Sequence, residues 1–313
     1  MKQENTYKKC PICANTKGLE YERTLNNIDL IKCKNCNFIF ANLSDQEIFD
    51  ANSSFDEKFV SSYNKMQSEI DINWFKKIVN KFNNTKIEKK VLDIGCGNGA
   101  LLNQFIKKGW EAYGMDFSPW AKEFSKLYGY KLYESTLENS NIPDNYFDLI
   151  TSSSTLEHIP QPKPFVKEVL RILKPDGITY FCGIPNYNSI SVKLNLSNFY
   201  YNEPPLHVNY FNYKSLQYLF LDYDIKKNIK TVNIKSYGIP ELHRSYNFML
   251  NFIKRNKTSI SNKNKKEENS LHKEKSLKYL LKNTLNNIII YINYYLGKPF
   301  KVGDKLEITI QKK

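Results

Sequence analysis

The sequence predicts a doubly wound α/β fold preceded by a small N-terminal module. Between residues 90 and 185, short apolar runs alternate with helical periods, which is typical of βαβ units and a parallel sheet covered on both faces. A glycine-rich stretch, VLDIGCGNGALL, stands where the first strand of this region turns into a helix. Two C-x-x-C pairs precede it near the N-terminus. These three observations divide the chain into a module and an α/β core.

The N-terminal module contains the cysteines of CPIC and CKNC, namely Cys10, Cys13, Cys33 and Cys36. The polar stretch between the pairs can form a short hairpin. Two such pairs present four thiolates to one tetrahedral Zn²⁺, and the metal supplies folding energy that so small a module lacks. Four thiolates leave no open coordination position, which favours a structural over a catalytic metal. We therefore expect a zinc ribbon over residues 1–44.

Charge and apolar composition limit the cellular compartment and the kinds of partner that we expect for this chain. The formal net charge of +14 is spread along the chain and clusters only in Lys254–Lys275, so a solvated basic surface is favoured over a nucleic-acid footprint. The longest apolar run, Ile288–Leu296, is far shorter than the roughly 20 residues of a membrane-spanning helix. No secretory signal is apparent at the N-terminus. We expect a cytoplasmic protein with reduced thiols and no transmembrane segment.

The elements of the chain are expected in a definite order. Apolar residues spaced by three and four from Phe55 to Phe82 predict a helix or a helix pair within a helical segment, residues 45–89. The core is expected over residues 90–240 and 301–313. Its expected elements are the strands VLDIGC, EAYGMDF, KLYEST, FDLITSSS, GITYFCGIP and KLEITIQKK, with helices over Ala100–Lys108, Pro119–Tyr128 and Pro164–Leu173.

The expected insertion, residues 241–300, combines the lysine-rich linker with a helix whose apolar residues from Leu277 to Leu296 form one stripe. This stripe could cover the active site or form a homodimer, and membrane binding is a less favoured alternative.

Two ligand classes could explain the glycine-rich turn. Gly95, Gly97 and Ala100 satisfy the dinucleotide fingerprint, with Asp116 about twenty residues further on. Asp93, however, precedes the glycines by two positions. A carboxylate there is unfavourable beside a pyrophosphate but suits a cationic ligand. The neighbouring residues therefore favour a cationic ligand.

Four segments together resemble the class I S-adenosylmethionine-dependent methyltransferases: VLDIGCGNGALL, YGMDFSP, NIPDNYFDLITSSSTLEHIPQP and VLRILKPDGITYFCGIPN. The resemblance covers about Lys90–Phe220 and is strongest to the small-molecule branch that includes ubiquinone-pathway O-methyltransferases. It implies a Rossmann-like, seven-stranded, mostly parallel sheet. The CPIC and CKNC module is similar to the zinc-ribbon head of a subset of these enzymes, many of which serve polysaccharide or secondary-metabolite pathways.

The resemblance also implies a cofactor site. Asp116 would accept hydrogen bonds from both ribose hydroxyls, because a carboxylate can bind a vicinal diol with two oxygens; the alternative role is a turn acid that caps the following helix. Thr136 stands where many relatives have an Asp for the adenine amino group. Cys96 lies in the turn, although its side chain, like that of Cys182, suits a small buried hydrophobe. The other implied cofactor-binding residues are Asp93, Gly95, Gly97, Gly99, Phe117, Leu137 and Glu157.

Two histidines are candidates for the catalytic base. His207 lies in the segment after the fifth strand, which covers the acceptor in this family, and His158 follows the fourth strand. Methyl transfer is an in-line displacement, so the protein mainly positions the reactants and deprotonates a hydroxyl acceptor. We expect His207 to act as the base and His158 to lie mainly on the cofactor side. The alternative for each is a histidine that holds a loop by hydrogen bonding.

The sequence therefore predicts transfer of a methyl group from S-adenosylmethionine to a small molecule or glycan precursor, at an oxygen. An RNA methyltransferase that docks RNA through its zinc ribbon is an alternative, although the ribbon holds few lysines and the familiar amine-methylation signature is missing. A non-catalytic zinc-ribbon scaffold is disfavoured because the cofactor-site residues are intact. A dehydrogenase that uses NAD is the least favoured alternative.

Overall fold

The computed structural model describes residues 9–53, 70–83, 89–193, 204–237 and 303–313 and divides the chain into two compact units. The larger unit contains nearly all of the described chain and both sheets. The smaller unit spans Asn188–Phe199 and Ser236–Lys305, and its described part includes α7 (Ile190–Lys193). None of the described helices is long and apolar enough to cross a membrane.

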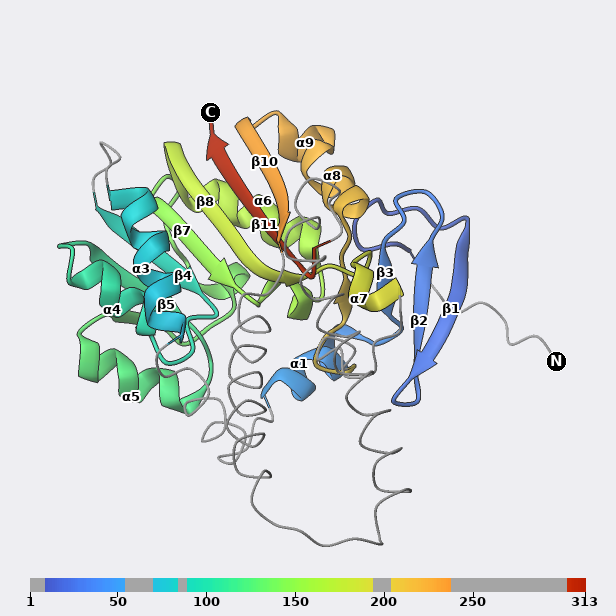
Figure 1. Cartoon of the computed structure of the whole chain (residues 1–313), viewed down its shortest axis with the longest axis horizontal. Helices are drawn as coiled ribbons and strands as arrows, with labels where there is room; N and C mark the ends of the chain where they lie inside the picture. The colour runs from blue at the N-terminus through green and yellow to red at the C-terminus, as the bar shows by residue number, and fades with distance from the viewer. Residues whose placement is uncertain (1–8, 54–69, 84–88, 194–203, 238–302) are drawn as a thin grey trace, which may run out of the picture. The chain divides into compact units, whose positions relative to one another are not determined.

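The central sheet has seven strands in the order β10-β11-β8-β7-β4-β5-β6 (Figure 1). The pairs β4–β5, β4–β7, β5–β6 and β7–β8 are parallel, which confirms the predicted doubly wound, mostly parallel sheet. The strands are β4 (Lys90–Ile94), β5 (Glu111–Met115), β6 (Lys131–Tyr133), β7 (Phe147–Ser153), β8 (Leu173–Pro185), β10 (Ile229–Tyr237) and β11 (Lys305–Lys312).

Both faces of this sheet are buried under helices. Val91 and Leu149 belong to one apolar cluster with α3 (Ile70–Asn83), α4 (Ala100–Ile106) and α5 (Pro119–Tyr128). Leu92 and Ile150, one residue further along the same strands, belong to a second cluster with α6 (Pro162–Ile172), α8 (Tyr213–Leu221) and α9 (Tyr223–Lys226). Because successive side chains of a strand point to opposite faces, a strand covered on both faces is apolar throughout.

Local signals explain most element boundaries. The helix α5 begins at Pro119 and is followed by a left-handed Gly129, the usual arrangement of a proline in the first turn and a glycine after the last. Asn212 and Ser215 form a capping box at the start of α8. The helix α6 begins at Pro162 rather than at the predicted Pro164, because a proline in the first turn of a helix sacrifices no hydrogen bond.

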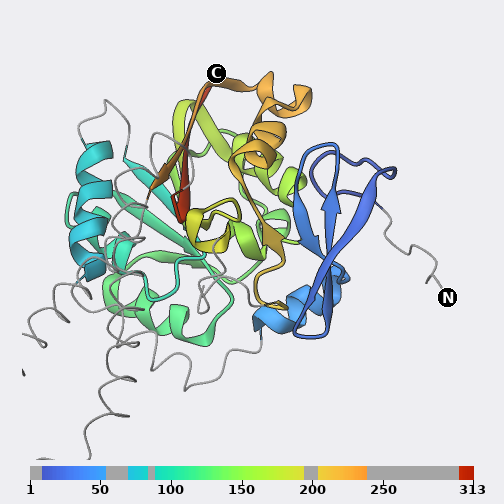
Figure 2. The same ribbon diagram turned by 45° about the vertical axis from the view of Figure 1, so that its right-hand side comes forward.

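A second sheet has the order β1-β2-β3-β9. The hairpin of β1 (Leu19–Leu25) and β2 (Ile28–Cys33) turns at two asparagines with positive φ, a feature of tight hairpin turns. The strand β3 (Ile39–Ala41) pairs antiparallel with β9 (Asn209–Tyr210), which lies far along the chain. In Figure 2 the blue strands β1–β3 lie beside the yellow-orange segment that carries β9. The N-terminal module is thus completed by residues outside the expected 1–44.

Several expected segments lie partly or wholly outside the described residues. The lysine cluster Lys254–Lys275 and the apolar stripe Leu277–Leu296 are among them. Of the predicted helical segment over residues 45–89, the structure describes α1 (Asp45–Ser53) and α3. The predicted final strand KLEITIQKK is β11.

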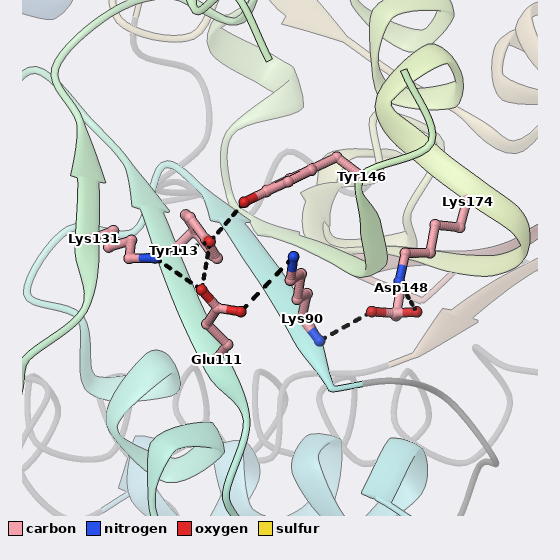
Figure 3. A network of polar contacts seen from close by, with 7 residues as sticks. All are labelled: Lys90, Glu111, Tyr113, Lys131, Tyr146, Asp148 and Lys174. Atoms are coloured by element: carbon pink, nitrogen blue, oxygen red, sulfur yellow. Dashed lines mark hydrogen bonds and ion pairs between the residues drawn. The ribbon is translucent and has the colours of Figure 1, made fainter. Parts of the chain in front are cut away.

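A polar network joins five strands at their amino ends (Figure 3). Glu111 accepts a hydrogen bond from Lys131 Nζ at 2.8 Å and lies 3.9 Å from Lys90 Nζ. Asp148 accepts from the backbone N–H of Lys90 and from Lys174 Nζ, both at 3.0 Å. Positive and negative side chains therefore alternate from β6 to β8, and this network links the amino ends of the five strands.

Removing the buried acid of this network should destabilise the fold. Asp148 is 5% exposed, so Asp148→Asn leaves Lys174 next to a weaker acceptor, and we expect a loss of about 2 kcal/mol in the free energy of unfolding. The matched control is Lys131→Gln, which breaks the solvent-exposed pair at the other end of the network and should leave stability nearly unchanged. Urea unfolding of both variants measures the difference. Equal effects would contradict this assignment.

Candidate functional site

A cavity of about 810 Å³ lies at the carboxyl edge of the central sheet. Its lining includes the ends of β4 and β5, the turn after β6, the 3₁₀ segments η1 (Leu137–Asn139) and η2 (Leu156–His158), helix α1, and the pair Leu206 and His207. Ligands of open α/β sheets bind at this edge because the loops that follow parallel strands meet there. Cavity volumes of 300–1,000 Å³ are usual for cofactor and small-molecule sites.

The glycine-rich turn forms one wall of the cavity. The backbone N–H of Gly95 donates to Met115 O at 2.8 Å, so the turn rests on the end of β5. A side chain at Gly95 would collide with Thr155, whereas a Cβ atom at Gly97 would have no atom within 4 Å. Gly95 therefore serves packing, and the space beside Gly97 is open to a ligand.

Asp116 faces the same cavity from the end of β5. Its Oδ2 accepts from the N–H of Gly97 at 2.8 Å, and its Oδ1 accepts from the N–H and the hydroxyl of Ser118 at 2.9 and 2.5 Å. The carboxylate thus fixes the turn before α5, whose N-cap is Ser118 with no side-chain cap bond, and it also joins that turn to the glycine loop. A carboxylate has about four acceptor positions, so one remains for a ligand hydroxyl.

Three other residues expected at the cofactor are turned away from the cavity. Asp93 is buried and accepts from Thr151 Oγ1 at 2.7 Å. Burial, opposed by the Thr151 hydrogen bond and reinforced by the charge of Asp116, raises the pKa of Asp93 to about 7. Gly99 precedes α4, with its Cα facing the ring of Tyr130, and Cys96 is buried. None of the three lines the described cavity.

The aromatic side of the cavity includes a residue that the sequence did not indicate. Phe117, Thr136 and Leu137 all line the cavity, as expected for an adenine site. The Phe117 ring lies 5.9 Å, centroid to centroid, from the ring of Phe49 in α1. Helix α1 also contributes Ile48 to the lining. The apolar residues of α1 could have indicated that this helix packs against another element, but not which one.

The two candidate histidines lie together at the other end of the cavity. Their ring centroids are 4.8 Å apart at an interplanar angle of 65°, and His158 Nδ1 lies 2.7 Å from Leu206 O. Burial, and then the neighbouring charge of His207, lower the pKa of His158 to about 3 against the opposing effect of the Leu206 carbonyl. His158 is therefore neutral at pH 7, and the geometry suits Nδ1–H as donor.

Glu157 lies beside the two histidines rather than in the cavity lining. Its side chain is buried, and one ligand-type atom from each of Glu157, His158 and His207 lies within 4.8 Å of the others. A carboxylate and two imidazoles can exchange protons, and they are also the kinds of side chain that bind divalent cations.

The four N-terminal cysteines converge in the module. Their sulfur atoms lie within 4.8 Å of one another, with Cys10–Cys36 at 3.5 Å and Cys13–Cys33 at 3.6 Å. A disulfide requires about 2.05 Å, whereas tetrahedral Zn–S bonds place sulfurs about 3.8 Å apart. The contact with Cys36 lowers the pKa of Cys10 to about 6. This donor set fits a tetrahedral thiophilic metal.

The charges around the cavity are unlike those of the chain as a whole. The described lining includes the carboxylates of Asp45, Asp116 and Glu138 but no lysine or arginine. The chain nevertheless carries a formal net charge of +14. The cavity therefore suits a cationic or neutral ligand and not a polyanion.

Comparisons with known proteins agree with this site. A family model described as "Methyltransferase domain" matches residues 66–227. A Yersinia enterocolitica protein named "Ubiquinone biosynthesis O-methyltransferase" is 31% identical over 104 residues, which cover 31% of this chain and 43% of that protein. A Yersinia pestis protein of the same name is 33% identical over 104 residues with the same coverage. The chain thus spans less than half of these relatives.

A solved structure supports the fold. It is titled as a Haemonchus contortus "Phospholethanolamine N-methyltransferase 2" in complex with phosphomonomethylethanolamine and S-adenosylhomocysteine. The match has a TM-score of 0.54 at 15% identity, and it covers 88% of this chain and 61% of that one.

Alanine at the two glycines should separate packing from ligand binding. Gly97→Ala places a methyl group in open space beside the cavity. The free energy of unfolding should therefore fall by only about 1 kcal/mol, because of the left-handed backbone. Binding of S-adenosylhomocysteine should weaken at least about tenfold, because the methyl group fills that space. Gly95→Ala should lower the melting temperature further through its collision with Thr155. Calorimetric titration and thermal melts measure both effects. Unchanged binding by Gly97→Ala would contradict the placement of the ligand.

The buried Asp93 should make stability depend on pH. Its pKa is raised to about 7 in the folded chain from about 4 in the unfolded chain, so the folded state binds this proton more tightly. Its contribution to stability therefore falls as the pH rises from about 4 to about 7 and is constant above that range. Asp93→Asn removes the contribution. The melting temperature of the variant minus that of the wild type should increase across this window, and a flat difference would contradict the burial effect.

Proposed function

The chain belongs to the methyltransferase domain family, and we propose that it binds S-adenosylmethionine and transfers its methyl group to an oxygen of a small, uncharged acceptor. The observation that carries this proposal is the hydrogen bond between Asp116 Oδ2 and the N–H of Gly97. This bond places an acid and an open backbone position on one wall of a cavity whose described lining lacks cationic side chains. Such a wall suits a cationic nucleoside with a vicinal diol.

Each part of the cavity has a role in this proposal. The open backbone at Gly97 would take the methionine part of the cofactor, and Asp116 would accept a hydrogen bond from a ribose hydroxyl at its remaining acceptor position. Phe117, Thr136 and Leu137 would contact the adenine. Bound S-adenosylmethionine supplies an electrophilic methyl group on a sulfonium. Asp93 is not part of the described lining and would make no direct contact with the cofactor.

Of the two histidines, we assign the role of general base to His207. A general base is most effective when its pKa lies near the operating pH, and the pKa of His158 is held near 3. His158 would instead orient the site, because its Nδ1 is fixed by Leu206 O while its Nε2 can accept a hydrogen bond. His207 would remove the acceptor's hydroxyl proton as the oxygen–carbon bond forms and the carbon–sulfur bond breaks.

The lining favours a neutral organic acceptor. Ile48, Phe49, Trp120 and Ile159 present apolar surface to the cavity, and the two Yersinia relatives carry names that describe O-methylation in ubiquinone biosynthesis. A phosphate-bearing glycan precursor or an RNA would bring anionic groups to a lining whose described charged side chains include three carboxylates. The electrostatics therefore support a phenol-like or alcohol acceptor over either of these.

We also propose that Cys10, Cys13, Cys33 and Cys36 bind one structural Zn²⁺. The mutual distances of their sulfurs support this assignment, as does the composition of the cluster, which among the described residues consists of these four cysteines. The metal would hold the module together and would leave no coordination position for substrate.

Two variants test the proposed function at separate steps. Asp116→Asn should weaken S-adenosylhomocysteine binding about 10- to 100-fold, because it removes charge-assisted hydrogen bonds. His207→Gln, which retains hydrogen bonding but cannot serve as the base, should bind the same ligand within about threefold and lower methyl transfer to a panel of catechols at least about 100-fold. Calorimetric titration and transfer of a labelled methyl group give the two readouts.

The control ligand is NAD, which should not bind the wild type. A folded wild-type protein that binds NAD in preference to S-adenosylhomocysteine would refute the proposed cofactor. Unchanged turnover in His207→Gln would remove His207 from the mechanism and leave the cofactor assignment standing.

A further inference from the structure

The segment from Pro204 to Tyr210 connects the cavity to the four-cysteine module. Leu206 and His207 line the cavity. Only two residues after His207, the chain enters β9, which pairs with β3 of the module in the register Ile39–Tyr210 and Phe40–Asn209. The acceptor side of the cavity and the last strand of the module's sheet are therefore one short stretch of chain.

The module holds this segment at several points. Asn26 Nδ2 donates to Pro204 O at 2.9 Å, and the N–H of Ala41 donates to Val208 O at 2.9 Å. Leu30, Ile39 and Ala41 pack with Val208 and Tyr210 in a separate apolar cluster. These contacts come from the turn of the β1–β2 hairpin and from β3, so they span the length of the module.

The opposite side of the segment is bonded to η2, which carries His158. The N–H of Val208 donates to Glu157 O at 3.0 Å. Asn209 is buried, and its Nδ2 donates to Leu156 O at 3.1 Å and to Ile159 O at 2.6 Å. The segment thus lies between the module and the histidine turn, and it has hydrogen bonds to each.

The cofactor side has a different support. The glycine turn and Asp116 are bonded to each other and to the end of β5, through Gly97 N–Asp116 Oδ2 at 2.8 Å and Gly95 N–Met115 O at 2.8 Å. These bonds belong to the central sheet. The two halves of the cavity therefore depend on different sheets for their geometry.

We propose that the metal-bound module is a positioning element for the acceptor half of the cavity: through β3 and β9 it places His207, so that metal loss releases this half while the cofactor half remains. The assignment of one half of the cavity to the cofactor and the other to the acceptor comes from the proposed function, and the inference rests on it. A strand of two residues has no stability of its own, and a four-cysteine module folds only with its metal. The positions of Leu206 and His207 consequently depend on the metal.

Hydrogen exchange of the full chain, before and after zinc removal with a chelator, tests this coupling. We expect amide exchange across residues 205–211 to accelerate at least about tenfold without zinc, because the β3–β9 bonds open. Amides of residues 112–118 should keep their exchange rates, and S-adenosylhomocysteine should bind within about threefold of the metal-loaded protein. Unchanged exchange across 205–211, or parallel loss of ligand binding, would overturn the inference. A purified protein without bound metal would overturn it as well.

A variant outside the metal site provides an independent test. Asn209→Ala removes the two hydrogen bonds to η2 but no metal ligand, so zinc content and S-adenosylhomocysteine affinity should be retained while exchange across 205–211 rises and methyl transfer falls. The matched control, Asn228→Ala, removes one exposed bond to Asp224 O and should change none of these. Equal exchange in both variants would refute the positioning role of β9. Failure of the wild type to bind S-adenosylhomocysteine would instead refute the proposed function, whatever the exchange shows.

Discussion

The parallel register of β4 and β5 is the constraint from which the site follows. Asp93 lies opposite Gly114 and Ile94 opposite Met115, so both strands end at the same level. Gly95 can then donate to Met115 O, and Gly97 can reach the carboxylate of Asp116. A shift of one residue would turn every side chain of the strand to the opposite face and break this bond. The sheet therefore determines the glycine loop, and the loop determines where a ligand can lie.

Charge is divided between the two edges of this sheet. At the amino edge, Lys131, Glu111, Lys90, Asp148 and Lys174 alternate in sign across five strands. At the carboxyl edge, the described lining of the cavity includes acids and neutral groups but no lysine or arginine. The strongly basic composition of the chain consequently says little about its ligand, because the basic side chains are not those that line the cavity. A site is better judged by its own lining than by net charge.

The sequence predicted the parts that depend on local pattern. The doubly wound α/β fold, most boundaries of the core elements and the convergence of the four cysteines follow from periodicity, caps and spacing. The sequence could not predict that β9 completes the module's sheet, because neither segment contains a pattern that indicates the pairing of Phe40 with Asn209. The same applies to Phe49, whose contact with Phe117 joins two segments that are far apart in the sequence. That Asp93 and Gly99 do not line the cavity depends on the path of the backbone through β4 and the following turn, which residue spacing does not determine.

This difference explains why a cofactor site is easier to read than an acceptor site in such a chain. The proposed cofactor half is lined by residues between Gly95 and Leu137, which follow three consecutive strands of the sheet. The proposed acceptor half combines α1, η2 and the segment that carries His207, which only tertiary contacts bring together. Because the strand after His207 is paired with the four-cysteine module near the N-terminus, the position of this histidine is a property of the assembled fold. No local motif could encode it.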